Sequence, residues 1–466
     1  MSSAELPDTP QSTGGEPYRP RCISLDLEVG REDDRIRALG AIRGDTDERF
    51  SHSRRQGISG ALSRLDELAD GASFVLGHNV IAFDLPHLRS ARPGLHLLKL
   101  PVIDTLRLSP LAFPRHPYHR LVKHYQDGGL IRDTRNDPLL DAGLALEVFG
   151  DQRDELLKLR YGSPGLLTAW HWLCTPEPDG VDSALNDFFA ELRAAPRPRK
   201  WEAAHAIRNL LQDKACTTHI REILDQIARH GWSLAYAMAW LSVAGGKSVM
   251  PPWVRHQFPD AGKLVRTLRD SACTDAACGW CRKHHDAHRQ MKRWFGFESF
   301  RGPSGRDGRS HQQAIVEDAM AGKSVLGILP TGTGKSLCYQ IPALARYHNT
   351  SALTVVISPL VALMADQVKG LESHGIECCV TVNGLLSMPE RAEALERVRL
   401  GDAGILLIAP EQLRSRTMRR ALDQRITDGV NHGRESSKVN QDCTICVPLR
   451  CTRSLLEPAA RAGKTS

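Results

Sequence analysis

The chain has 466 residues, of which 41% are apolar and 25% charged, a composition that excludes wholesale disorder and fibrous repeats. It contains no apolar run of about 18 residues, and residues 1–20 are polar without an apolar signal core, so we expect no transmembrane helix, no membrane partner and a cytoplasmic location. The net charge of +7 is a weak indication of a nucleic-acid partner.

The hydrophobic pattern divides the chain into five segments. A polar tail (1–20) precedes a segment in which strand-like alternation gives way to helical periodicity (21–160). A Trp- and Ala-rich helical linker then ends in a Cys/His cluster (161–300). Strands and helices alternate again over 301–425, and this rhythm is lost over 426–466. We therefore predict an α/β protein of about three domains, with a tail at each end.

The first strand carries two carboxylates on one face. Apolar residues occupy every second position between Cys22 and Val29, so Asp26 and Glu28 share the opposite face. Two adjacent like charges raise each other's pKa unless a cation lies between them, and hard divalent cations prefer carboxylate oxygens. The alternative is an edge strand with a solvated acidic face.

Two later carboxylates are placed to join this pair. Asp84 follows a strand predicted over 74–79 and lies near a helix start. Asp137 precedes Pro138, which is typical of a helix cap followed by Pro at the first helical position. Asp141 then lies one turn inside that helix, on a face that can point toward the same site.

The order of these residues resembles the DEDD exonuclease superfamily. The resemblance covers about residues 21–150 and rests on D-x-E at Asp26, N-x-x-x-F-D ending at Asp84, the late Asp141, and the segment 102–106. It implies a ribonuclease-H-like fold and hydrolysis of DNA from a 3′ end. By this resemblance two Mg²⁺ or Mn²⁺ ions, one activating water and one stabilising the leaving oxygen, would be held by Asp26, Glu28, Asp84 and Asp141.

The sequence departs from the family at the general base. One branch of the family has His where this chain has Asn136, and the other has Tyr where it has Asp137. Asn cannot act as a general base. Either a histidine of the preceding segment supplies this function (His116, His119 or His124), or the exonuclease is weak or inactive.

A phosphate loop follows in the last third of the chain. The apolar run 324–329 predicts a buried strand, and a helix is predicted from Leu337. Strand, Gly-rich loop and helix form the context in which backbone N–H groups and a helix N-terminus surround phosphate oxygens. We expect Lys335 to contact the outer phosphates of ATP and Ser336 to ligate Mg²⁺, in a loop that also contains Thr331, Gly332, Thr333 and Gly334.

The surrounding motifs resemble the RecQ family of superfamily-two DNA helicases. They are SLCYQIPAL over 336–344, VVISPLVALMADQV over 355–368 and ILLIAPE over 405–411. The resemblance implies the first RecA-like lobe of an ATP-dependent DNA helicase, with Gln312 reading the adenine of ATP. After Ser336 the sequence contains no Asp-Glu pair and nothing that resembles a second lobe, so we expect a helicase core truncated before its DEAH motif.

Two classes of function therefore remain open. The chain is either a DNA-processing enzyme or a fragment that binds ATP and DNA without turnover. In either case the expected partner is DNA, single-stranded or 3′-ended, and the chain alone is expected to lack unwinding activity.

A Cys/His cluster lies between the two predicted domains. Cys273-x4-Cys278-x2-Cys281 is followed by three histidines, and Cys3His is a known zinc ligand set, for which we take His285 as the fourth ligand, with His288 as the other candidate. The alternatives are an iron–sulfur cluster that recruits Cys216, or no metal. Basic and aromatic residues surround the cluster, which favours DNA binding, although a solvated basic linker has the same composition. The spacing of Cys443, Cys446 and Cys451 suggests a weaker metal candidate.

Overall fold

The computed structural model describes residues 18–30, 33–53, 57–115, 125–126, 129–130, 137–243, 250–302, 304–330, 332–427 and 443–446. These residues form a mixed α/β structure that divides into two compact units. Unit 1 comprises Met1–Ala112, Arg120–Lys158 and Glu177–Leu192, and unit 2 comprises Phe113–His119, Leu159–Pro176 and Arg193–Ser466. Among the described helices, none is both long and apolar enough to cross a bilayer.

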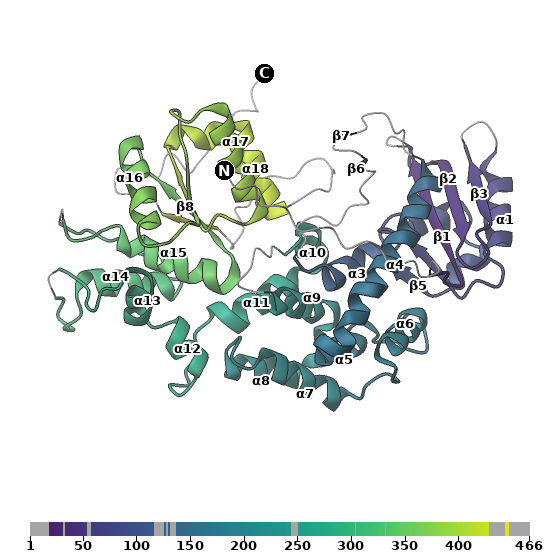
Figure 1. Cartoon of the computed structure of the whole chain (residues 1–466), viewed down its shortest axis with the longest axis horizontal. Helices are drawn as coiled ribbons and strands as arrows, with labels where there is room; N and C mark the ends of the chain where they lie inside the picture. Colours follow the sequence, from purple (N-terminus) through teal and green to yellow (C-terminus); the bar gives the residue numbers. More distant parts are fainter. Residues whose placement is uncertain are drawn as a thin grey trace, which may run out of the picture. The chain divides into compact units, whose positions relative to one another are not determined.

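Unit 1 is built on a five-stranded sheet with the order β3-β2-β1-β4-β5 (Figure 1). The strand β1 is central, antiparallel to β2 and parallel to β4. Its bounds are those predicted from the alternating pattern. The strands are β1 (Cys22–Val29), β2 (Ile36–Arg43), β3 (Arg49–His52), β4 (Phe74–Gly77) and β5 (Val102–Asp104). A separate two-stranded pair consists of β6 (Tyr125–Gln126) and β7 (Gly129–Leu130).

The two faces of β1 are covered by different helices. On one face Leu25 and Leu27 pack in a core with Leu62 and Leu65 of α1 and with Leu88 of α2. On the other face the Ser24 hydroxyl donates to the Ala142 carbonyl of α4, so α4 crosses the side that carries the acidic residues. The helices of this unit are α1 (Ile58–Leu68), α2 (Asp84–Ala91), η1 (His96–Lys99), α3 (Thr105–Ala112), α4 (Pro138–Gly162) and α6 (Ser183–Arg193).

The first part of unit 2 is helical, as its periodicity predicted. Its longest apolar helix, α9, buries eight consecutive residues from Leu234 to Leu241 against its neighbours. The helices are α5 (Pro164–Cys174), α7 (Lys200–Leu211), α8 (Thr217–Asp225), η2 (Ile227–Arg229), α9 (Gly231–Ser242), α10 (Pro252–Gln257), α11 (Pro259–Asp270), α12 (Gly279–His284) and α13 (Ala287–Phe295).

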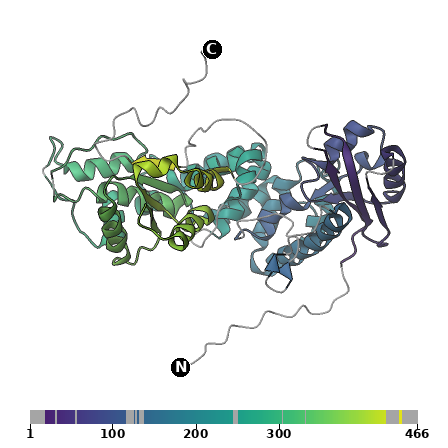
Figure 2. The ribbon, with the colours of Figure 1, turned by 90° about the horizontal axis from the view of Figure 1, so that it is seen from above.

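The rest of unit 2 is an α/β lobe around a parallel sheet with the order β11-β8-β10-β9. Alternate residues of β8 enter two cores, Val356 with residues of α15 and α16, and Val355 with residues of α17 and α18. Figure 1 labels β8 and these four helices, and Figure 2 shows the ribbon of the lobe from above. The elements are α14 (His311–Met320), α15 (Leu337–Thr350), β8 (Leu353–Ile357), α16 (Val361–Glu372), β9 (Cys379–Val382), α17 (Met388–Leu400), β10 (Ile405–Ile408), η3 (Pro410–Arg414), α18 (Arg416–Thr427) and β11 (Cys443–Cys446).

The strand predicted over 324–329 does not form, and this prediction was wrong. Residues 323–330 have extended or irregular backbone without sheet pairing, and the side chains of Leu326 and Ile328 are 75% and 76% exposed. An apolar run becomes a buried strand only where a neighbouring strand satisfies its backbone groups. In the described part of the sheet, β11 occupies the place beside β8, and no described strand pairs with the other edge of β11.

Candidate functional sites

Three carboxylates of unit 1 meet on the side of β1 that faces α4. Oxygens of Asp26, Glu28 and Asp141 all lie within 4.8 Å of one another. The close packing of α4 on β2 explains the position of Asp141, because a Cβ atom on Gly40 would lie 2.2 Å from the Leu139 nitrogen. We call Asp26, Glu28, Asp84 and Asp141 the acidic cluster.

Asp84 is not in this group of oxygens within 4.8 Å, but it lies near Asp26 and is hydrogen-bonded to the backbone of β1. The pairing of β1 with β4 ends near Gly77, so the amide of Leu27 lies beyond that ladder. Asp84, the first residue of α2, accepts a hydrogen bond from this amide at 2.9 Å. Burial and the neighbouring charge of Asp26 raise the pKa of Asp84 well above its ordinary value. A carboxylate with these neighbours favours either a proton or a cation beside it.

The sequence reasoning did not single out Asp104, which shapes the turn that leads to Asp84. Its buried carboxylate accepts hydrogen bonds from the amides of Asn79, Ile81 and Leu106. Asn79 has a φ of 66°, a left-handed conformation that Asn tolerates better than most residues. The sequence contains one indication of this role, an acidic residue directly after the apolar pair Val102 and Ile103. The pKa of Asp104 is raised, chiefly by burial.

Of the residues considered for the general base, only Asp137 is among the described residues. Asn136, His116, His119 and His124 lie outside the described residues. Asp137 accepts hydrogen bonds from the amides of Leu139 at 3.0 Å and Leu140 at 3.4 Å, so it caps α4 as its position before Pro138 predicted.

The phosphate loop of unit 2 turns at two glycines immediately before α15. Gly332 and Gly334 have φ values of 84° and 75°, in the left-handed region that favours glycine. The Thr333 hydroxyl donates to the Pro330 carbonyl at 2.7 Å, and Lys335 is exposed. Ser336 immediately precedes α15, and the amides of Leu337 and Cys338 donate to the carbonyls of Gly334 and Lys335 in the loop. Thr331 lies outside the described residues.

Gln312 is buried against this loop. Its Nε2 donates to the carbonyls of Thr333 at 3.0 Å and Gly334 at 2.8 Å, and its Oε1 accepts from the amide of Arg301 at 2.9 Å. A Cβ atom at position 334 would lie 2.8 Å from this Nε2. The amide therefore contacts the loop itself, and it must leave these carbonyls to reach an adenine.

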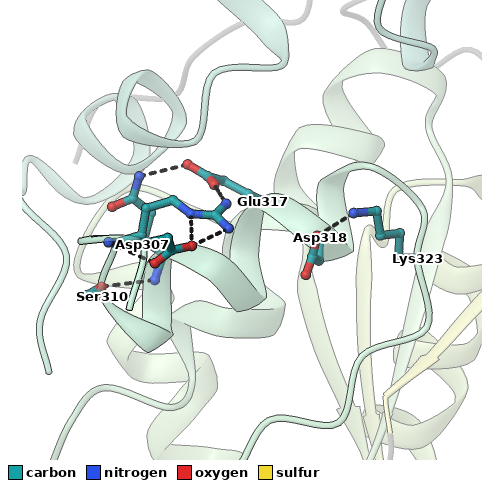
Figure 3. Close-up of polar contacts among 7 residues, drawn as sticks. Asp307, Ser310, Glu317, Asp318 and Lys323 are labelled. Atoms are coloured by element: carbon teal, nitrogen blue, oxygen red, sulfur yellow. Dashed lines mark hydrogen bonds and ion pairs between the residues drawn. The ribbon is translucent and has the colours of Figure 1, made fainter. Parts of the chain in front are cut away.

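Helix α14, which carries Gln312, is fixed at both ends by polar contacts (Figure 3). At its start the Ser310 hydroxyl accepts from the Gln313 amide, and Arg309 pairs with both Asp307 and Glu317. At its end Lys323 pairs with Asp318 at 2.8 Å. These contacts are local to α14 and its flanking turns, whereas the contact of this helix with the phosphate loop is made by Gln312 itself.

The other two helicase-like motifs follow strands of the parallel sheet. Residues 358–360 leave the carboxyl end of β8 and residues 409–411 leave the carboxyl end of β10, so both segments lie at one edge of the sheet. Gln367 of α16 accepts from Tyr339 at 3.1 Å and from Gln340 at 2.8 Å. This contact joins the helix after β8 to the helix after the phosphate loop.

Four cysteines meet at the junction of α8, α11 and α12. The Sγ atoms of Cys216, Cys273, Cys278 and Cys281, which we call the thiol cluster, lie within 4.8 Å of one another. The structure thus brings the three predicted cysteines together with Cys216, which the sequence suggested as fourth ligand only for an iron–sulfur cluster. The fourth ligand predicted for zinc, His285, is not in this group. Hydrogen bonds from backbone and side-chain donors at Cys281 and Thr217 lower the pKa of Cys278 to about 6 against the effect of burial. Of the C-terminal cysteines, Cys451 and the side chains of Cys443 and Cys446 lie outside the described residues.

The loop, its helices and the motifs define a class of protein for part of unit 2. Residues 309–431 match the DEAD/DEAH box helicase family. This segment is therefore similar to DEAD/DEAH box helicases, and the similarity implies ATP and Mg²⁺ as ligands.

Comparison with curated proteins narrows the kind of helicase. The chain is 41% identical over 131 residues to the ATP-dependent DNA helicase RecQ of Bacillus subtilis, and 36% identical over 125 residues to the probable ATP-dependent DNA helicase RecS of the same organism. It is 39% identical over 105 residues to human ATP-dependent DNA helicase Q4. These alignments cover 28%, 27% and 22% of this chain, and 20%, 22% and 8% of the three relatives. The helicase segment is thus similar to RecQ-type DNA helicases, and the chain spans about a fifth or less of their length.

Proposed function

We propose that this chain is a DNA-processing protein in which a metal-dependent 3′–5′ exonuclease domain (21–160) precedes the ATP-binding lobe of a RecQ-like DNA helicase (301–425). The helical segment 161–300 would link the two. The helicase part rests on the family match and on the RecQ-type relatives. The nuclease part rests on one observation, the meeting of Asp26, Glu28 and Asp141 with Asp84 beside them.

The donor set of the acidic cluster suits Mg²⁺ or Mn²⁺. Carboxylate oxygens of Asp26 and Glu28 on β1 and of Asp141 in the first turn of α4 form a compact group of hard ligands. The sheet order β3-β2-β1-β4-β5, with its central strand carrying the first two acids, supports a ribonuclease-H-like fold. Divalent cations held there would activate water and stabilise the leaving oxygen of the DNA backbone.

The chain's own contribution to this reaction is to hold the carboxylates in place. The Leu27 amide orients Asp84, and the Asp104 carboxylate fixes the turn before it. Asp137 caps the helix that presents Asp141. Because Asp84 is buried beside Asp26, its pKa is raised, and a cation near it would favour its ionised form.

In the helicase lobe, ATP would bind with its phosphates at the loop before α15. The exposed ammonium of Lys335 would contact the outer phosphates, and the Ser336 hydroxyl would ligate Mg²⁺. DNA would pass over the carboxyl edge of the parallel sheet, where the segments after β8 and β10 lie.

A second candidate is a protein that binds ATP and DNA without hydrolysing ATP. The two candidates differ in one step, the attack of water on ATP, which an Asp-Glu pair would support; residues 337–466 contain no such pair. Steady-state ATPase assays with and without DNA separate the two candidates. We expect negligible turnover of the printed chain, and strong DNA-stimulated hydrolysis would exclude the binding-only function.

The nuclease is tested with single-stranded DNA labelled at its 5′ end. In Mg²⁺ or Mn²⁺ the chain should shorten the DNA from the 3′ end, and EDTA should stop the reaction. Asp26→Asn should remove this activity, whereas Lys335→Ala should retain it. Shortening that persists in Asp26→Asn would reject the acidic cluster as the site.

A further inference from the structure

The thiol cluster gathers cysteines that are distant in sequence. Cys216 immediately precedes α8, Cys273 lies in the loop after α11, Cys278 immediately precedes α12, and Cys281 lies within α12. Cys216, Cys278 and Cys281 are buried, with exposed fractions of 0%, 2% and 8%. All four are free thiols. Four convergent thiols in one small volume form the donor set of a structural metal site, because each becomes a sulfur ligand when a cation displaces its proton.

The distances between the sulfur atoms distinguish the possible partners. A zinc ion bound by four thiolates at about 2.3 Å places its sulfurs about 3.8 Å apart along the edges of a tetrahedron. The Sγ atoms of Cys216 and Cys278 are 3.8 Å apart, and no pair in the cluster exceeds 4.8 Å. A disulfide would need a sulfur separation of about 2.0 Å. A four-iron cluster would need the cysteines spread around four iron and four sulfide atoms, a larger body than this group encloses.

Neighbouring donors suit bound thiolates. The Cys273 amide donates to Cys281 Sγ at 3.4 Å, and the Thr217 hydroxyl donates to Cys278 Sγ at 3.6 Å. Such donors orient ligand sulfurs and offset part of their charge. From this geometry we propose that Cys216, Cys273, Cys278 and Cys281 bind one Zn²⁺ in a tetrahedral structural site.

The site would stabilise the packing of α12 against the helicase lobe, because the last residue of α12, His284, contacts α15. Trp280 stacks on His284 with ring centroids 3.7 Å apart, and His284 stacks on His348 of α15 at 5.5 Å. Arg269 completes the contact: its carbonyl accepts from Trp280 Nε1 at 3.1 Å, and its guanidinium donates to the His348 carbonyl at 3.4 Å. Through α12, the zinc would stabilise the C-terminal end of α15, the helix whose first residue follows the phosphate loop.

The metal content of the full chain tests the ligand set. The protein is purified from medium that contains both zinc and iron, and its metals are measured by mass spectrometry. We expect one zinc per chain without iron or acid-labile sulfide. Cys216→Ser should lower zinc retention at least tenfold against a competing chelator, whereas His285→Ala should retain it. Iron with labile sulfide, loss of zinc in His285→Ala but not in Cys216→Ser, or absence of both metals would each overturn the proposal.

Two further measurements separate ligand loss from misfolding and from binding elsewhere. Co²⁺ in place of zinc in the unmutated chain should give the intense charge-transfer absorption of four thiolates, and a spectrum without thiolate bands would overturn the site. Asp26→Asn should leave this absorption unchanged, since the acidic cluster offers only oxygen ligands. Cys378→Ser, a half-buried cysteine of the same unit outside the thiol cluster, serves as the matched control and should retain zinc.

Discussion

Unit 1 and unit 2 differ in the sign of the ionisable groups gathered at their candidate sites. In unit 1 the buried ionisable groups around the end of β1 are carboxylates, Asp84 and Asp104, and burial raises the pKa of both. In unit 2 three basic groups gather where α12 meets α15, the buried Arg269 and His284 and the half-buried His348, and burial lowers the pKa of all three. One carboxylate, Asp270, lies next to Arg269 in the sequence and pairs with Arg346 of α15 at 3.9 Å. Under the proposed function, cations would complete the first arrangement. The second lies at the far end of a helix that begins at a loop suited to anionic phosphates.

The largest effect is expected at the carboxylates of unit 1. Asp141→Asn removes one ligand oxygen charge from the acidic cluster, and metal ions contribute several kcal/mol to such reactions, so we expect the metal-dependent loss of 3′ nucleotides to fall by roughly 10²- to 10³-fold. The rate is measured under single-turnover conditions in Mn²⁺.

Asp137→Asn is the matched control for this variant. It changes a carboxylate of the same helix that serves only as a cap, so the rate should stay within about a factor of two, and any cost should appear in stability, up to about 1 kcal/mol. Equal losses of activity in both variants would mean that Asp141 supports the position of α4 and does not bind a metal ion.

The positive side of the comparison is tested at the phosphate loop. Lys335→Ala removes a charge-assisted contact worth about 1.5–3 kcal/mol, so affinity for a non-hydrolysable ATP analogue should fall roughly 10- to 100-fold in calorimetry. Lys323→Ala removes an exposed lysine that pairs with Asp318 at the end of α14 and should leave the affinity unchanged. An unaffected Lys335→Ala would contradict phosphate binding at this loop.

A smaller effect is expected at Gln312, which now donates to the loop carbonyls. If its amide moves to an adenine when ATP binds, Gln312→Ala loses a base contact of about 1–1.5 kcal/mol, so the preference for ATP over GTP should fall roughly tenfold. Affinity for inorganic triphosphate should hardly change. Gln313→Ala, which alters the neighbouring contact with Glu317, should keep the preference. A Gln312→Ala variant with unchanged selectivity would leave Gln312 as a support of the loop alone.

The smallest effect concerns pH, where the two units should respond in opposite directions. Burial lowers the pKa of His284 to about 3 and of His348 to about 4, with nearby positive charges adding to the shift. In the unfolded chain both histidines bind a proton near pH 6.5. Their contribution to the stability of unit 2 is therefore fully present above about pH 6.5, and it is lost as the pH falls toward 4 and 3. Asp84 acts with the opposite sign: its contribution is greatest below the ordinary carboxyl value of about 3.9 and is lost as the pH rises through its raised pKa.

The tryptophans make this difference measurable, because all eight lie in unit 2. The urea midpoint followed by tryptophan fluorescence should fall between pH 7 and pH 5. His348→Phe keeps the stacking on His284 but removes one titrating ring. The slope of the free energy of unfolding against pH should therefore decrease by up to about 1.4 kcal/mol per pH unit. His256→Phe, at an exposed histidine, should leave the slope unchanged. Hydrogen exchange at β1 amides, which reports unit 1, should not show the same acid loss.

The sequence allowed accurate prediction where local pattern and local structure coincide. Period-two alternation predicted β1 with its observed bounds, and Asp137 before Pro138 predicted the start of α4. The meeting of Asp26, Glu28 and Asp141 followed from these two elements, since α4 crosses the acidic face of β1.

The remaining features depend on contacts between distant segments, which local pattern does not contain. The apolar run 324–329 has the composition of a strand, but no described strand pairs with it. Cys216 lies 62 residues before Cys278, so spacing alone favoured a nearby histidine over it as the fourth ligand. Asp104 acts through the amides of a turn about 25 residues earlier, which only the fold brings beside it.

The acidic cluster as a divalent-cation site is the central claim, and a crystal structure with Mn²⁺ would test it most directly. Anomalous scattering at the manganese absorption edge locates the ion independently of any assumption about activity. The account predicts anomalous density between the carboxylates of Asp26, Glu28 and Asp141, and its loss in crystals of Asp26→Asn. Saturating Mn²⁺ without density at these carboxylates, in crystals that retain the described β1 and α4, would contradict it.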